Sequence, residues 1–218
     1  MLPKAVVFDV DGVLFDTEVM IRRGWEAVST RLGRPEIGQQ YLDYVGQSRK
    51  DIVDRLHSRF GADFDALAFL VEVTDFCIDR WEHGGLILKP GVTEILDYLE
   101  SRNVPMALAT STRASRTARR MELTGLGHYF RAFATGDMVT HGKPDPEIYL
   151  LACEKLGVDP GQALAVEDVR NGIRSAYGAG MQVVMIPDLI PHSAALDPML
   201  LTWQPDLLQL RNYLMANE

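Results

Sequence analysis

The sequence predicts an α/β protein, a doubly wound, Rossmann-like parallel sheet that carries a helical cap domain inserted after its first strand. Short apolar runs rich in β-branched residues alternate with amphipathic helical patterns along most of the chain. A long stretch near the N-terminus holds helical patterns alone, and several apolar runs end directly in acidic or hydroxyl residues. Alternation of this kind produces right-handed crossovers between parallel strands, with helices on both faces of the sheet.

The first strand is predicted at Ala5-Val6-Val7-Phe8, an apolar run that meets the polar turn Asp9-Val10-Asp11-Gly12. Later runs of the same form predict strands at 105–109, 163–166 and 182–186, with a weaker one at 132–134. The amphipathic patterns between these strands predict helices at 92–102, 114–123, 146–156 and 170–179. Together these elements form the predicted sheet domain.

The stretch after the first strand breaks the alternation. It shows helical blocks near 18–32, 48–60 and 63–81 and no buried strand. Gly84-Gly85 and Lys89-Pro90-Gly91 mark the return to the sheet, because glycine and proline interrupt regular structure. The predicted boundaries place residues 1–16 and 89–218 in the α/β core domain and residues 17–88 in the helical cap domain.

Composition disfavours several classes of function. The 218 residues carry a formal net charge of -8, which argues against nucleic acid as a partner, because its phosphates attract lysine and arginine. No segment is long and apolar enough to cross a bilayer, and the N-terminus lacks the form of a signal peptide, so a cytoplasmic location is expected. Cys77 and Cys153 have no cysteine or histidine partner nearby and are interpreted as buried thiols. The oligomeric state stays open, and a monomer fits the sequence.

Polar side chains gather at the carboxyl ends of the predicted strands, where parallel α/β sheets bind their ligands. The candidates are four acids, two hydroxyl residues and a lysine: Asp9, Asp11, Glu167, Asp168, Thr110, Ser111 and Lys143. Four carboxylates in one place repel one another, so the pattern predicts a hard divalent cation among them. Mg²⁺ fits, since it is held by one or two carboxylates together with waters and substrate phosphate.

A carboxylate that the metal leaves available suits attack on phosphorus, because carboxylates form acyl-phosphate intermediates, and Asp9 fits this role. Asp11 lies two residues further along an extended backbone, faces the same way, and suits protonation of the leaving oxygen and activation of water. Lys143 and Thr110 suit stabilisation of charge on the transferred group. Each residue also has a structural interpretation as a helix cap or a surface residue. Their joint occurrence at strand ends and in the loops that follow favours the site.

The same residues resemble the motifs of the haloacid dehalogenase superfamily of phosphatases and mutases. Asp9-Val10-Asp11-Gly12-Val13 looks like its first motif, Thr110 like its second, Lys143 like its third and Glu167-Asp168 like its fourth. The segments 142–146 (Gly-Lys-Pro-Asp-Pro) and 167–173 (Glu-Asp-Val-Arg-Asn-Gly-Ile) resemble the branch with a small helical cap. That branch includes β-phosphoglucomutase and many sugar-phosphate phosphatases.

The resemblance implies a role for each motif residue. Asp9 would be the nucleophile and Asp11 the acid and base, while Thr110, with Ser111 beside it, and Lys143 would bind phosphate. Mg²⁺ would be bound by Asp9, the carbonyl of Asp11 and Asp168, with Glu167 close by. The implied function is a Mg²⁺-dependent phosphatase for a small phosphorylated metabolite such as a sugar phosphate, acting through an aspartyl-phosphate.

Two members of the superfamily are set aside on residues. Dehalogenases lack the second aspartate of the first motif and need no metal, whereas Asp11 is present here. Phosphonoacetaldehyde hydrolases also replace that aspartate and add a cap lysine that forms a Schiff base. The one lysine of the predicted cap, Lys50, is interpreted as lying on a solvated helix face.

The segment Gly46-Gln47-Ser48-Arg49 resembles the substrate-specificity loop of such caps. Gly46 would let the backbone approach the ligand, and Arg49 would meet a hydroxyl group or a second phosphate of the substrate. A helix N-cap at Ser48 followed by a solvated Arg49 is an equally good interpretation. The other arginines of the cap do not sort into pocket and surface residues by sequence.

Two alternatives to a phosphatase stay open. A phosphomutase would return the phosphoryl group from Asp9 to the substrate, and a regulatory or binding protein would keep the fold without turnover; the intact motifs disfavour the second. Hydrolysis is favoured over transfer because Ile21 stands where β-phosphoglucomutase has a histidine that positions the acid/base aspartate, and no lysine occurs between Lys50 and Lys89. Without a contact that delays Asp11, water is expected to reach the phosphorylated Asp9.

Overall fold

A computed structural model describes residues 2–218, and the chain divides into two compact units. Met1–Phe15 and Leu88–Glu218 form the first unit, and Asp16–Ile87 form the second. The second unit is a single insertion in the sequence of the first. We describe each unit by itself.

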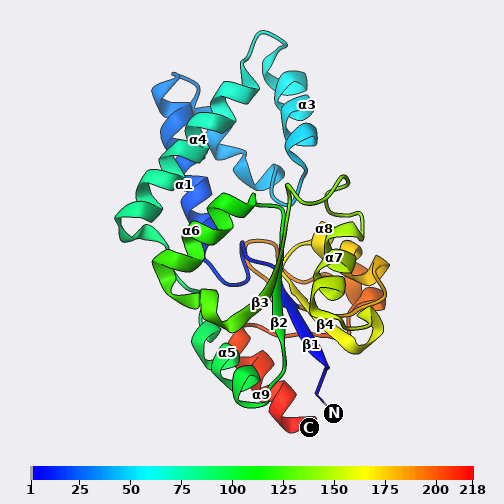
Figure 1. Ribbon diagram of the computed structural model, residues 1–218. Helices are drawn as coiled ribbons and strands as arrows, with labels where there is room; N and C mark the ends of the chain where they lie inside the picture. Colours follow the sequence, from blue (N-terminus) through cyan, green and yellow to red (C-terminus); the bar gives the residue numbers. More distant parts are fainter. Residues whose placement is uncertain (1) are drawn as a thin grey trace. The chain divides into compact units, whose positions relative to one another are not determined.

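The first unit is built on a six-stranded sheet in which every paired strand is parallel (Figure 1). The strand order is β3-β2-β1-β4-β5-β6. The strands are β1 (Ala5–Phe8), β2 (Met106–Thr110), β3 (Phe130–Thr135), β4 (Ala163–Glu167), β5 (Gln182–Met185) and β6 (Thr202–Trp203). The order of connection reverses between β1 and β4, which makes their carboxyl ends the switch point of the sheet. The predicted fold class, a doubly wound parallel sheet, is confirmed.

Helices cover both faces of this sheet (Figure 1). On one side lie α7 (Glu147–Leu156) and α8 (Arg170–Gly178), and on the other lie α5 (Val92–Ser101), α6 (Ala114–Thr124) and α9 (Leu207–Ala216). Every residue of β1 is fully buried, as its continuous apolar sequence requires for a strand covered on both faces. Small side chains at the inner positions of β2 and β4, such as Ala107, Ala109 and Ala165, belong to the core beneath α7 and α8.

In the first unit, the structure adds a strand and an α-helix near the C-terminus to the elements expected from the sequence. β6 is a two-residue strand that pairs with β5 at the edge of the sheet, and α9 packs against α5. Leu207, Leu210 and Leu214 are the buried residues of α9, and Asp206 caps its N-terminus by accepting a hydrogen bond from the amide of Gln209 at 2.7 Å. The C-terminal segment therefore contributes to the apolar core on that face.

The second unit is helical, and the described residues of this unit form no strand. Its helices are α1 (Thr17–Arg31), α2 (Pro35–Gln39), α3 (Arg49–Phe60) and α4 (Ala66–Arg80). The segment Trp81–Gly85 follows α4 and kinks where His83 and Gly84 leave the helical conformation. Trp25 lies at the centre of its core, with its ring 5.4 Å from that of Tyr41, 4.9 Å from that of Tyr44 and 5.0 Å from that of Phe69. Such an aromatic cluster gives this short insertion a core of its own.

Within residues 2–218 we find no helix with the length and apolar character that a bilayer crossing requires.

Candidate active site

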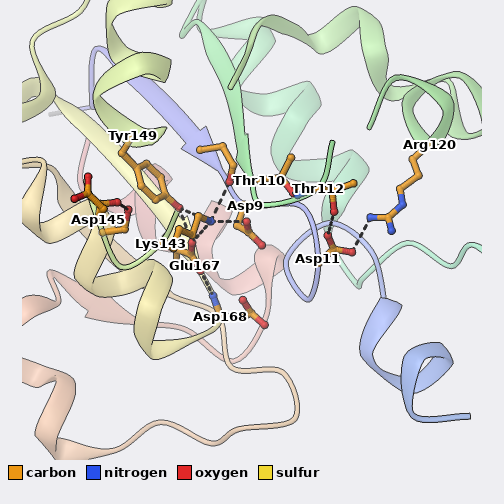
Figure 2. Close-up of polar contacts among 12 residues, drawn as sticks. Asp9, Asp11, Thr110, Thr112, Arg120, Lys143, Asp145, Tyr149, Glu167 and Asp168 are labelled. Carbon is orange, nitrogen blue, oxygen red and sulfur yellow. Dashed lines mark hydrogen bonds and ion pairs between the residues drawn. The ribbon is translucent and has the colours of Figure 1, made fainter. Parts of the chain in front are cut away.

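The centre of the candidate site is a buried lysine that contacts two acids (Figure 2). Lys143 Nζ donates hydrogen bonds to Asp9 Oδ1 at 2.6 Å and to Glu167 Oε1 at 2.5 Å, and also to the carbonyl of Ala109 at 3.0 Å. The Tyr149 hydroxyl donates to the same Glu167 oxygen at 2.6 Å. The structure thus brings together side chains from the ends of β1 and β4, from α7 and from the loop before α7.

Strand geometry explains this convergence. Asp9 follows β1 and Glu167 ends β4, and the two strands are direct neighbours, with Asp9 N donating to the carbonyl of Val166 at 3.0 Å. Gly172 on α8 makes room for the Glu167 carboxylate, because a Cβ at that position would lie about 2 Å from it. The glycine in the motif that follows Glu167 is therefore needed for close packing of the helix over the acid.

Burial sets the electrostatics of the pair. Burial raises the pKa of Asp9 to about 8, and the neighbouring Lys143 ammonium opposes this effect without cancelling it. For Lys143, burial alone would lower the pKa, but the charges of Asp9 and Glu167 outweigh it and raise the pKa. Burial, followed by the Glu167 charge, also raises the pKa of the Tyr149 hydroxyl, which keeps it a hydrogen-bond donor. The single positive charge of Lys143 does not neutralise all the acids around it.

The donor set fits a divalent cation. Carboxylate oxygens of Asp9, Glu167 and Asp168, all three buried, lie within 4.8 Å of one another. Oxygen donors from carboxylates are the ligands that Mg²⁺ prefers. A cation beside Asp9 would favour the ionised form of its carboxyl group, which burial disfavours.

Asp11 lies beside this cluster, but its carboxylate points to other partners. Figure 2 shows it directed toward Thr112 and Arg120, while Asp9 is directed toward Lys143. Arg120 Nη1 donates to Asp11 Oδ1 at 2.7 Å, and Thr112 Oγ1 donates to Asp11 Oδ2 at 2.9 Å. The Arg120 side chain is buried at 6% exposure, whereas the Asp11 side chain is 26% exposed, so this ion pair is partly shielded from water. Asp11 is therefore held, although the sequence argument against a mutase assumed that nothing holds it.

The two predicted phosphate-binding hydroxyls differ in their surroundings. Thr110 is buried at the end of β2, and its Oγ1 accepts a hydrogen bond from the amide of Thr112 at 3.1 Å. Ser111 is exposed. The structural alternative, in which this segment caps α6, does not hold, because the first amide of α6 at Ala114 bonds to Asp137 Oδ1 at 2.9 Å.

The predicted specificity residues belong to the helical unit. Gly46 is exposed with a φ of 73°, and Gln47 donates to the carbonyl of Asp43 at 2.5 Å. Ser48 caps α3 by accepting a hydrogen bond from the amide of Asp51 at 3.2 Å, as the structural interpretation of this segment predicts. Arg49 begins α3 and is exposed, and no ion pair or hydrogen bond joins its guanidinium to another described residue.

Several other arginines of this unit are engaged, whereas Arg23 is exposed like Arg49. Arg22 pairs with Glu26 and Arg59 with Asp43, while the Arg80 guanidinium lies 5.4 Å from the centre of the Phe76 ring. Lys50 is exposed and stands 3.8 Å from Asp54, in agreement with its interpretation as a solvated helix residue.

The sequence analysis did not single out four residues that the structure places at the site. They are Thr112, Arg120, Tyr149 and Asp188. Asp188 lies three residues beyond the end of β5, and its place after a strand was the available signal. Arg120 carried no such signal. The same helix holds other arginines, and the sequence does not show which of them points inward.

The comparisons with known proteins agree with this geometry. Residues 3–180 match the model of the family described as haloacid dehalogenase-like hydrolase. The phosphorylated carbohydrates phosphatase of Thermotoga maritima is 33% identical over 181 residues, which cover 82% of this chain and 82% of that protein.

Solved structures are similar over almost the whole chain. A candidate beta-phosphoglucomutase from Thermotoga maritima is 29% identical with a TM-score of 0.79, over 97% of this chain and 98% of that one. A mutant of CbbY from Rhodobacter sphaeroides in complex with xylulose-(1,5)bisphosphate is 26% identical with a TM-score of 0.77, over 96% of each chain.

The family match makes this doubly wound α/β protein a hydrolase. The chain belongs to the haloacid dehalogenase-like hydrolase family.

Proposed function

We propose that this hydrolase removes phosphate from a small phosphorylated carbohydrate, with Asp9 as nucleophile and Mg²⁺ as cofactor. The observation that carries the proposal is the contact of Lys143 with both Asp9 and Glu167, at the switch point of the sheet and beside Asp168. Parallel sheets bind ligands at this point, and a buried ammonium among carboxylates suits a phosphate ester. The Thermotoga maritima relative, named a phosphorylated carbohydrates phosphatase, supports the class of substrate.

The reaction follows from the positions of two acids. Asp9 attacks phosphorus, the bond to the leaving oxygen breaks, and the phosphoryl group is carried on the Asp9 carboxylate. Lys143, which already contacts Asp9 Oδ1, would stabilise the negative charge on the transferred group, and the buried Thr110 would add a hydroxyl donor. Asp11 would protonate the leaving oxygen and then take a proton from the water that releases phosphate.

The contacts of Asp11 with Arg120 and Thr112, called the Asp11 clamp below, add a step to this scheme. Arg120 and Thr112 together donate hydrogen bonds to both oxygens of the Asp11 carboxylate. A general acid must carry a proton and reach the leaving oxygen. Asp11 would therefore leave Arg120 and take up a proton from solvent when substrate binds. It would give this proton to the leaving oxygen, accept another from the attacking water, and release that proton to solvent as it returns to Arg120.

Asp9, the Asp11 carbonyl and Asp168 would hold the metal, with Glu167 nearby. When bound, Mg²⁺ supplies positive charge to the phosphoryl oxygens and screens the repulsion between these acids and an anionic substrate. Arg49 is the cap residue that we propose for recognition of the remainder of the substrate, because it is an exposed arginine at the start of α3 and lies in the predicted specificity segment with Gly46 and Gln47.

A phosphomutase is the second candidate, and the Asp11 clamp favours it. The case for hydrolysis assumed that no contact delays Asp11, and Arg120 and Thr112 supply such a contact from the core unit. The candidate beta-phosphoglucomutase among the solved relatives also fits this reading. We retain hydrolysis as the proposal, because Ile21 lacks the hydrogen-bonding group of the mutase and Arg80 already lies over Phe76.

Phosphorus NMR separates the two activities. With Mg²⁺, β-glucose 1-phosphate and a trace of the glucose bisphosphate, we expect the substrate signal to be replaced by inorganic phosphate, with no isomer formed. A set of other sugar phosphates, followed in the same way, would identify the preferred substrate. Conversion to glucose 6-phosphate with little inorganic phosphate would contradict hydrolysis and assign the mutase.

A further inference from the structure

Asp188, beyond the end of β5, has a buried carboxylate oxygen without a hydrogen-bond partner. Its Oδ1 accepts a hydrogen bond from Lys89 Nζ at 2.6 Å, and its side chain is 8% exposed. Its Oδ2 is buried and contacts no donor among the described residues. A buried carboxylate oxygen without a donor is costly, so a group that binds it is expected to come from outside the chain.

The unpartnered oxygen lies close to the predicted metal ligand Asp168. A Cβ built on Gly12 would lie 2.1 Å from Asp168 Oδ2 and 3.3 Å from Asp188 Oδ2. Both oxygens therefore converge on the same small space, which Gly12 keeps open by having no side chain. Gly12 also adopts a φ of 80°, which favours glycine at this position.

The local charge favours a divalent cation in this space. The acids around Lys143 and the pair of Lys89 with Asp188 together contain four carboxylates and two ammonium groups. These groups belong to Asp9, Glu167, Asp168, Asp188, Lys89 and Lys143. When all of them are ionised, two negative charges stay unneutralised within these clusters. One divalent cation balances them, whereas an anionic ligand near Asp188 would be repelled.

We propose that Asp188 accepts a hydrogen bond from a water molecule bound to the metal ion, and that Lys89 orients Asp188 for this role. This inference rests on the proposed function, since it assumes the metal site of Asp9 and Asp168. Lys89 occupies Oδ1 and so turns Oδ2 toward the ion, while the ion keeps several waters, as Mg²⁺ does in proteins. Partners outside the direct ligands commonly change metal affinity by about 10- to 100-fold.

Calorimetric titration of MgCl₂ into the purified protein tests the proposal without any measurement of turnover. Asp188→Asn is expected to weaken Mg²⁺ binding by about tenfold or more, because an amide is a weaker acceptor and carries no charge. Lys89→Gln is expected to bind Mg²⁺ at least as tightly as the wild type, because it removes a nearby positive charge. Glu154→Gln, which neutralises an exposed acid on α7, serves as the charge control and should bind like the wild type.

The double variant Asp188→Asn with Lys89→Gln excludes a simple charge effect. Its net charge equals that of the wild type, yet we expect its affinity for Mg²⁺ to stay about tenfold weaker, because the acceptor for the bound water is missing. It also removes the unpaired lysine that could unfold the single variant.

Wild-type affinity in the double variant, or in Asp188→Asn, would overturn the inference and leave the proposed function intact. If Lys89→Gln weakened Mg²⁺ binding as much as Asp188→Asn does, the pair would have only a structural role, and the inference would be overturned. If the wild-type protein binds no Mg²⁺ at all, the metal part of the proposed function falls together with the inference.

Discussion

Asp9→Asn is expected to lower the rate of phosphate release by at least about a thousandfold. The amide is a poor nucleophile for phosphorus and a weak metal ligand, so both roles of Asp9 are lost together. The fold is expected to persist, because the side chain keeps its size and Lys143 keeps its contact with Glu167 at 2.5 Å. Phosphate release from a sugar phosphate, measured with folded protein whose circular dichroism matches the wild type, checks this result.

Asp63→Asn is the matched control, since it makes the same chemical change at an exposed acid of the helical unit. It should retain wild-type activity. If the Asp9→Asn protein kept more than about a tenth of wild-type activity, with its asparagine verified by mass spectrometry, another residue would have to be the nucleophile.

Removal of divalent metal is expected to abolish phosphate release, and addition of Mg²⁺ is expected to restore it. Without the ion, the ionised carboxylates of Asp9 and Asp168 would repel each other and the incoming phosphate group. Activity in EDTA should fall by at least about a hundredfold, since charge stabilisation on this scale contributes several kcal/mol. Asp168→Asn should require a higher Mg²⁺ concentration for half-maximal activity.

Full activity of the metal-free protein in excess EDTA would refute the metal assignment. It would reopen the metal-independent chemistry of the dehalogenases, in spite of Asp11. Metal content measured by atomic emission before the assay makes this outcome unambiguous.

Much of the core fold could be predicted because its strands are continuous apolar runs. Residues 5–8 and 163–166 read as strands since a parallel strand is buried on both faces, and the structure buries both of them completely. β6 has no comparable pattern: Thr202 is half-buried and Trp203 is exposed, and pairing with β5 alone makes them a strand. The conformation of a two-residue edge strand therefore depends on pairing with the neighbouring strand, which its own sequence does not show.

The acids and Lys143 could be expected near one another because parallel strands end at one edge of the sheet. The contacts that α6 makes with the site could not be predicted from the sequence. Arg113, Arg116, Arg119 and Arg120 are close together in the sequence, and only the last is buried. It shares the inner face of α6 with Thr117 and Met121, and this face becomes apparent only once the helix is docked on the sheet.

The proposed specificity residues are the hardest to predict from the sequence. The segment from Gly46 to Arg49 suits both a ligand-binding loop and a helix N-cap, and the N-cap at Ser48 is present. A residue can cap a helix and still border a ligand, so local structure does not decide the role of Arg49. The substrate determines which cap residues matter, and the sequence carries no direct record of it.

Chemical trapping tests most directly the central claim that Asp9 carries the phosphoryl group during turnover. The enzyme is mixed with Mg²⁺ and a sugar phosphate that it hydrolyses, quenched in acid and treated with borohydride, which reduces an acyl phosphate to an alcohol and leaves free carboxylates unchanged. We predict that the peptide containing residue 9 then holds homoserine in place of Asp9, and only when substrate was present. Reduction at Asp11, Glu167 or Asp168, or no reduced residue during steady phosphate release, would contradict the account.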